Sequence, residues 1–244
     1  MNFLTALLAV GLAFVHILAG KLRFLDTIPR SRWLSMAGGV SVAYVFVHLL
    51  PELNERQHAF EHSTNSILTY FEDHVYLVAL LGLAAFYGLE RAANLSRRSN
   101  RKAGKKDTTS WDVFWIHIIS FSLYNALIGY LLVHRQEPEF LNLLLFSFAM
   151  ALHFIVNDYG LRENHKHDYD RIGRWILAIA IVFGCIVGQA TEIQEMAVSA
   201  LFAFVGGGVI LNVLKEELPE ERESRFWAFA LGAFGYAVIL LLTD

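Results

Sequence analysis

Long uncharged runs of hydrophobic residues alternate along this chain with short polar segments. Each run matches the length of about 20 mainly apolar residues that a helix needs to cross the hydrocarbon core of a bilayer. The pattern predicts an all-α bundle of eight membrane-spanning helices, with no room between them for a soluble domain. We place these helices at residues 2–20, 33–51, 74–92, 112–134, 140–160, 172–190, 194–214 and 224–243.

The composition changes this picture little and excludes several classes of protein. Of the 244 residues, 55% are hydrophobic and only 18% are charged, whereas soluble domains carry about 25% charged residues. A net charge of −3 offers no basic surface for nucleic acid. The single cysteine, Cys185, excludes a disulfide within the chain. We therefore expect one membrane domain over residues 1–244, with no nucleotide, no organic cofactor and no enzymatic activity.

The positions of the positive charges predict the orientation of the helices. Lys and Arg are enriched in the cytoplasmic loops of membrane proteins. With the N-terminus outside, 18 of the 20 Lys and Arg residues fall on the cytoplasmic side, and only Arg56 and Arg135 do not. A basic linker, residues 93–111, lies between the third and fourth helices on that side. The sequence thus predicts a multi-pass protein of the plasma (inner) membrane with both termini outside.

A weak internal repeat relates the second and seventh predicted helices. The segments GGVSVAYVFVHLLPE and GGVILNVLKEELPE both start with glycines, and Pro51 and Pro219 lie twelve residues beyond Gly39 and Gly207, respectively. Because the two helices cross the membrane in opposite directions, the pattern predicts an inverted repeat, as in many secondary transporters. The alternative is that glycine starts and proline ends are ordinary helix punctuation.

Polar residues at membrane depth gather on the fourth and fifth predicted helices. Such residues are costly in lipid and usually face a cavity or one another. Asp158 is the only acid placed well inside a predicted helix, and His153 and Asn157 share one face of its helix. Asn125 lies near the middle of the neighbouring helix. Imidazole, carboxylate and amide groups together suit a divalent cation, so we predict a site formed by His153, Asn157, Asp158 and Asn125.

These residues resemble the metal-binding motifs of the ZIP family of divalent-metal transporters, which has eight spans and both termini outside. The family's His-Asn-x-x-Asp/Glu-Gly pattern is similar to the run from Tyr124 to Gly129, which keeps the Asn and the Gly. Its His-Glu-x-Pro-His-Glu pattern is similar to the run from His153 to Asp158, which keeps the first His and the final acid. The resemblance implies transport of a divalent metal, zinc first of all, toward the cytoplasm by alternating access between the fourth and fifth helices.

The chain also departs from the family's pattern. Tyr124, Ile128 and Phe154 stand where the family has ligands, and Val156 replaces the usual proline. A centre of two metals bridged by carboxylates is therefore not expected, whereas one metal held by the four residues above is. A ZIP-fold protein that no longer transports, and acts as a sensor or partner subunit, is the second hypothesis.

Histidines elsewhere add further expectations. An ion entering or leaving the site would pass near His117, His48, His165 and His167. A third hypothesis, a membrane redox protein, would use histidine pairs as haem ligands. Its candidates are His16, His48, His117, His134 and His153. The expected partners are the lipid bilayer and, in a homodimer, a second copy of the chain.

Overall fold

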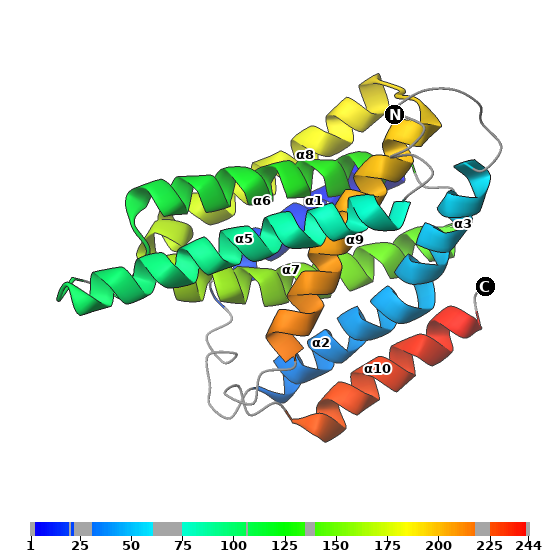
Figure 1. The fold of residues 1–244 in the computed structure, drawn as a ribbon. Coiled ribbons are helices and arrows are strands. Elements are labelled where there is room, and N and C mark those ends of the chain that lie inside the picture. The colour runs from blue at the N-terminus through cyan, green and yellow to red at the C-terminus, as the bar shows by residue number, and fades with distance from the viewer. Residues whose placement is uncertain are drawn as a thin grey trace. The chain divides into compact units, whose positions relative to one another are not determined.

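In the computed structural model, residues 3–19, 21, 31–60, 75–105, 107–134, 140–217 and 225–242 are described. These residues form helices and connecting segments, and no strand occurs among them (Figure 1). The α-helices are α1 (Phe3–Ala19), α2 (Arg32–Tyr44), α3 (Leu50–Phe60), α5 (Val75–Lys102), α6 (Trp111–Leu131), α7 (Phe140–His165), α8 (Arg174–Ala190), α9 (Glu195–Glu217) and α10 (Phe226–Leu241). Two π-helical turns, η2 (Val45–Leu49) and η3 (Tyr169–Gly173), join α2 to α3 and precede α8.

Several of these helices suit a membrane. Among the described residues, six continuous helical stretches are long and apolar enough to cross one, at Arg32–Gln57, Val75–Lys102, Trp111–Leu131, Phe140–His165, Tyr169–Ala190 and Glu195–Lys215. The helices α1 and α10 are apolar but shorter. The prediction of an all-helical membrane protein is therefore confirmed.

The position of Pro51 in the sequence suggested that the second helical stretch ends there. In the structure, the stretch continues beyond Pro51. Proline has no backbone N–H, so it leaves one carbonyl of the preceding turn without its usual helical partner. The chain absorbs this defect with the π-helical turn η2, in which the backbone N–H of Leu50 donates to the carbonyl of Val45. Helix α3 then continues to Phe60, well beyond the predicted end at residue 51. Pro219, the matching residue of the repeat, lies outside the described residues.

The basic linker predicted over residues 93–111 is helical for its first half. Helix α5 runs on to Lys102, and Gly104, at φ 68°, takes a left-handed conformation that suits glycine. Hydrophobic periodicity had marked only the apolar part of α5, because its last turns are amphipathic and rich in Arg. The segment between α5 and α6 is therefore short, residues 103–110.

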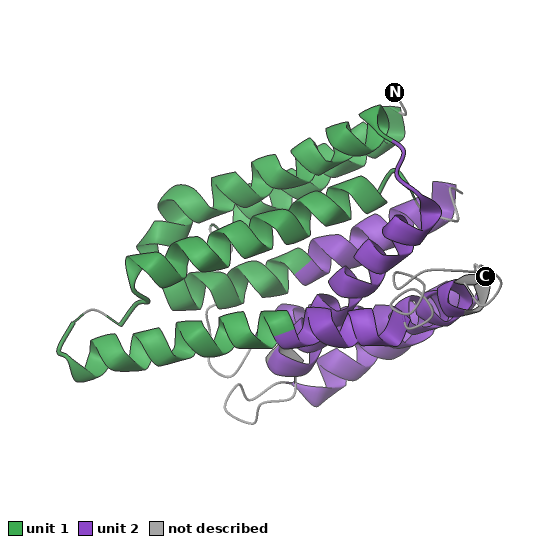
Figure 2. Cartoon of the chain, turned by 45° about the horizontal axis from the view of Figure 1, so that its top comes forward, with its two compact units in different colours: residues 1–22, 85–135, 154–191 green, residues 23–84, 136–153, 192–244 purple. Residues whose placement is uncertain are grey.

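The chain divides into two compact units (Figure 2). Unit 1 comprises residues 1–22, 85–135 and 154–191, and unit 2 comprises residues 23–84, 136–153 and 192–244. Helices α5 and α7 each contribute one part to each unit. The single predicted membrane domain is thus built from two clusters of helices that interleave along the sequence.

Unit 1 is organised around α8, which packs against both α6 and α1. Glycines allow α6 and α8 to approach at backbone distance. A Cβ at Gly129 would collide with the carbonyl of Ile181, and a Cβ at Gly184 would collide with the carbonyl of Ala126. Small residues commonly permit such close contacts between membrane helices.

Glycines also permit close contacts between helices at two places in unit 2. A Cβ at Gly39 of α2 would collide with the carbonyl of Phe229 on α10. A Cβ at Gly207 of α9 would collide in the same way with the carbonyl of Ala79 on α5. The two glycines of the sequence repeat therefore both mark close helix contacts.

The partner helices contribute glycines of their own, again in matching places. Gly232 of α10 meets the carbonyl of Met36, three residues before Gly39. Gly82 of α5 meets the carbonyl of Phe204, which also lies three residues before its repeat glycine. The contact between α2 and α10 is thus repeated, residue for residue, by the contact between α9 and α5.

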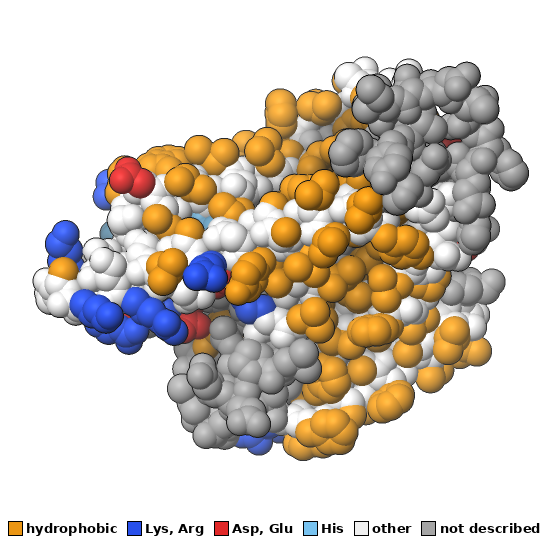
Figure 3. All heavy atoms as spheres, in the orientation of Figure 1, with side chains coloured by type: hydrophobic (Ala, Val, Ile, Leu, Met, Phe, Trp, Pro, Cys, Tyr) orange, Lys and Arg blue, Asp and Glu red, His pale blue; other side chains and the backbone are white. Residues whose placement is uncertain are grey.

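The surface agrees with a lipid environment. Hydrophobic side chains cover most of the face seen in Figure 3, while Lys and Arg gather toward the end of α5. Large hydrophobic residues point outward along α10, where Phe226, Leu231 and Phe234 are all more than 60% exposed. Such exposure is ordinary only where lipid replaces water.

Candidate functional site

His16 is the centre of a buried polar cluster in unit 1. It lies in the last turn of α1 and is 0% exposed. Its Nδ1 is 2.9 Å and 3.0 Å from the two carboxylate oxygens of Asp158 on α7, and its Nε2 is 2.8 Å from Oδ1 of Asn125 on α6. Three helices thus each contribute one polar side chain to a single point in an apolar interior.

The hydrogen bonds fix which atoms of His16 carry protons. The amide nitrogen of Asn125 donates to the carbonyl of Phe121, 2.8 Å away, so its Oδ1 faces His16 and accepts. Nε2 of His16 must therefore carry a proton. The remaining proton lies between Nδ1 and the Asp158 carboxylate, either as imidazolium with carboxylate or as imidazole with carboxylic acid. In both forms the cluster has no net charge and holds one transferable proton.

The walls of this cluster are aromatic. The ring of Phe154, 0% exposed, lies 4.6 Å from the His16 ring between centroids. The hydroxyl of Tyr169 is buried and close to Asp158, but it makes no hydrogen bond of good geometry among the described residues. Burial among such groups strengthens the interaction of His16 with Asp158 because little water competes for it.

The four residues predicted as a metal site are all buried. Asn125 and Asp158 both contact His16, from opposite sides of its ring. Asn157 precedes Asp158 in unit 1, and His153 belongs to unit 2. The structure therefore joins two of the four through a third residue that the sequence did not assign to the site.

This geometry limits what can bind without rearrangement. A zinc ion sits about 2.0–2.2 Å from its nitrogen and oxygen ligands. Asn125 and Asp158 are separated by an imidazole ring, so one ion cannot reach both while His16 stays between them. Among the described residues, no group of three or more His, Cys, Asp and Glu side chains is arranged to hold a metal ion. A cation at Asp158 must displace either the shared proton or the His16 ring.

A second buried polar cluster lies in the same unit, nearer the segment between α5 and α6. Nδ1 of His117 is 2.8 Å from Nε2 of His165, and Nδ1 of His165 is 2.5 Å from the hydroxyl of Thr109. Both histidines are 1% exposed and Thr109 is 8% exposed. The structure thus pairs two of the four histidines predicted along an ion path.

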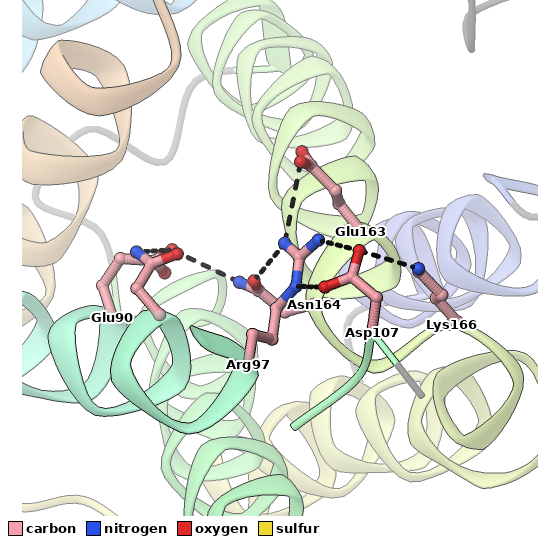
Figure 4. A network of polar contacts seen from close by, with 7 residues as sticks. Glu90, Arg97, Asp107, Glu163, Asn164 and Lys166 are labelled. Atoms are coloured by element: carbon pink, nitrogen blue, oxygen red, sulfur yellow. Dashed lines mark hydrogen bonds and ion pairs between the residues drawn. The ribbon is translucent and has the colours of Figure 1, made fainter. Parts of the chain in front are cut away.

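Charged residues form a network of polar contacts around the segment between α5 and α6 in unit 1 (Figure 4). Arg97 of α5 donates to Asp107 at 3.1 Å and to the side chain of Asn164 at 3.0 Å, while Lys166 donates to Asp107 at 3.2 Å. The hydrogen bond from Arg97 is the main reason that the pKa of Asp107 is lowered from its ordinary value. The network fastens the segment containing Thr109 to both α5 and α7.

The other predicted histidines lie elsewhere. His48 occupies the π-helical turn η2, with Nε2 3.6 Å from Glu52. His134 stacks on Tyr130 at 4.4 Å, and His167 is exposed. None of these contacts joins them to the His16 cluster.

Sequence reasoning missed His16, Thr109 and Tyr169 as members of these clusters. His16 gave one usable signal, because an ionisable residue inside a predicted membrane helix is rarely idle. Its partners lie more than 100 residues away in the chain, so no spacing rule connects them.

Comparison of the chain with family models, curated proteins and solved structures found no match.

Proposed function

We propose that this protein is a membrane transporter, organised like the ZIP family, that moves a divalent cation toward the cytoplasm in exchange for protons. The observation that carries the proposal is the contact of His16 with Asp158 and Asn125. Ionisable groups buried between membrane helices typically mark ion pathways and proton relays.

The chemistry of the cluster supports exchange. Asp158 and His16 together hold one transferable proton and no net charge. A divalent cation that takes the carboxylate must release that proton, which limits the cost of placing charge in an apolar interior. Asn157, buried next to Asp158 on the same helix, belongs to the proposed ligand set.

The glycine contacts of unit 2 support the proposed eight spans and inverted repeat. A repeat that relates the first three spans to the last three exchanges α2 with α9 and α10 with α5. Such a repeat requires the contact between α2 and α10 to have a counterpart between α9 and α5. The contact of Gly39 with α10 and the contact of Gly207 with α5 fit this requirement. With the positive charges inside, both termini lie outside the plasma membrane.

A protein with this fold that does not transport is the second candidate. The observation in its favour is that His16 already fills the space beside Asp158 where a cation would bind. For the haem hypothesis, two of the candidate ligands, His16 and His117, already use ring nitrogens in hydrogen bonds to other buried side chains. The partners remain the bilayer and, in a homodimer, a second copy.

Zinc binding and uptake test the proposal. We expect the purified protein to bind zinc and, in liposomes, to accumulate it at a rate that falls about tenfold or more in Asp158→Asn, which removes the only charge of the cluster. Asn212→Asp and Asn212→Ala on α9 serve as matched controls, because this buried amide lies in unit 2. Binding without uptake would favour the second candidate, and the absence of both would refute the transporter.

A further inference from the structure

The cluster of Thr109, His165 and His117 is an unbroken chain of hydrogen bonds. It runs from a hydroxyl through two imidazoles, with links of 2.5 Å and 2.8 Å between successive atoms. His165 uses both ring nitrogens in these links, and His117 uses its Nδ1. A chain of this kind conducts protons, because every member can both donate and accept.

Aromatic rings lie beside both histidines of the chain. The ring of Phe114 lies 5.3 Å from His165, and the ring of Phe121 lies 5.4 Å from His117. The charged groups that face His165 are Glu90 and Arg97, both from α5. Glu90 accepts a hydrogen bond from the side-chain nitrogen of Asn164, and Arg97 donates one to its oxygen, so Asn164 links the two charged groups.

The chain begins at Thr109 and ends at His117, inside unit 1. Thr109 lies in the segment between α5 and α6, and its backbone N–H donates to the carbonyl of Asn164 at 3.2 Å. His165 follows Asp158 by seven residues on α7, a rise of about 10 Å. The ring of Tyr169 and the side chain of Ile118, the residue after His117, both border Gly173. The buried hydroxyl of Tyr169 is close to Asp158.

We propose that Thr109, His165 and His117 form the proton path between the His16–Asp158 pair and the cytoplasmic side of the protein. This inference rests on the proposed function. It assigns to the three residues the proton half of the exchange and leaves the cation to Asp158. The ion pairs of Arg97 and Lys166 with Asp107 act as positioning contacts, because they hold the segment that carries Thr109.

The transfer balances without any other reactant. A proton from water binds the Thr109 oxygen, whose own proton passes to Nδ1 of His165. The proton on Nε2 of His165 passes to Nδ1 of His117, and the proton on Nε2 of His117 is released to the interior. One proton enters, one leaves, and every hydrogen bond in the chain reverses its direction. Rotation of the hydroxyl and return of the tautomers then reset the path.

Thr109 offers the sharpest test. Thr109→Val keeps the size of the side chain and removes its hydroxyl, whereas Thr109→Ser restores the hydroxyl. Thr191→Val is the matched control, since its hydroxyl bonds to the carbonyl of Val187 at the exposed end of α8. Liposomes that contain a pH-sensitive dye report proton movement under a potassium–valinomycin clamp, driven either by a pH difference alone or by added zinc.

We expect Thr109→Val and His165→Gln to slow proton movement about tenfold or more under both driving forces. Thr109→Ser and Thr191→Val should stay within twofold of the native rate, and the zinc affinity of all variants should be unchanged. The path is refuted if Thr109→Val conducts protons as fast as the native protein, or if the native protein conducts none. Proton movement that depends on Thr109 but ignores zinc would refute the proposed function and leave the path intact.

Discussion

Each unit buries an acid beside a histidine, but the two clusters are built differently. In unit 2, His48, Glu52 and Arg56 lie four residues apart on one continuous helix, and Nη2 of Arg56 is 2.8 Å from Glu52. In unit 1, His16, Asp158 and Asn125 come from three different helices. The first cluster is fixed as soon as its helix forms, whereas the second exists only while three helices keep their positions.

The partner of each acid sets what the cluster can do. Arg56 is 1% exposed, donates to Ser199 at 2.8 Å, and has its guanidinium 4.5 Å from the ring centroid of Phe202. Because Arg does not lose its proton in proteins, Glu52 is neutralised permanently. Asp158 is neutralised by a histidine, which can release a proton. The acid of unit 1 is therefore suited to exchange and the acid of unit 2 to stability.

The largest effect that this comparison predicts is on stability in unit 2. Arg56→Met leaves Glu52 buried without its partner and should lower the free energy of unfolding by about 3–5 kcal/mol. Denaturant titration of the protein in detergent measures this loss. The double variant Glu52→Gln, Arg56→Met should recover most of it, because no buried charge remains. An Arg56→Met protein as stable as the native one would contradict the structural role.

The sequence predicts the cluster of unit 2 better than it predicts the cluster of unit 1. Apolar runs predicted the helices, since burial in lipid imposes a length and a composition that can be counted. The apolar runs misplaced the ends of α3 and α5. The pattern of hydrophobic residues does not reveal a π-helical turn or an amphipathic extension of a helix. The cluster of unit 2 follows the i, i+4 spacing of one helix and is readable in principle.

The cluster of unit 1 could be read only in part. Asp158 and Asn125 stood out as polar residues at membrane depth, but their common partner His16 is joined to them by tertiary packing alone. The packing of α1 onto α8 depends on contacts that no local pattern encodes. The sequence therefore suggested which residues are chemically active and not which of them meet.

Substitution of the glycines at the helix contacts should have a second, smaller effect on stability. Gly39→Ala and Gly207→Ala should each lower the free energy of unfolding by about 1–3 kcal/mol, because the added methyl group meets a backbone carbonyl. The two costs should agree closely if the contacts are equivalent. Gly235→Ala on α10 is the control, since nothing lies within 4 Å of a Cβ there. Markedly unequal costs for Gly39 and Gly207 would argue against the repeat.

The smallest effect concerns the pH dependence of the ion pairs near Thr109. The pKa of Asp107 is lowered in the folded protein from its ordinary value of 3.8. Its contribution to stability is therefore complete above that ordinary value and is lost as the pH falls through the lower, folded value. For so exposed a group the contribution is below about 1 kcal/mol. The difference in stability between native protein and Asp107→Asn, measured from pH 7 down to pH 3, should shrink only in the acidic part of this range.

The most direct test of the central claim is the number of protons released when zinc binds. Calorimetric titration of the purified protein in two buffers of different ionisation enthalpy gives this number. We predict about one proton per zinc ion for the native protein, because the ion displaces the proton shared by His16 and Asp158. In Asp158→Asn, zinc should bind about tenfold more weakly or not at all, and any binding should release almost no proton, because no carboxyl group is left to share one with His16. Unchanged proton release or unchanged affinity in Asp158→Asn would contradict the account.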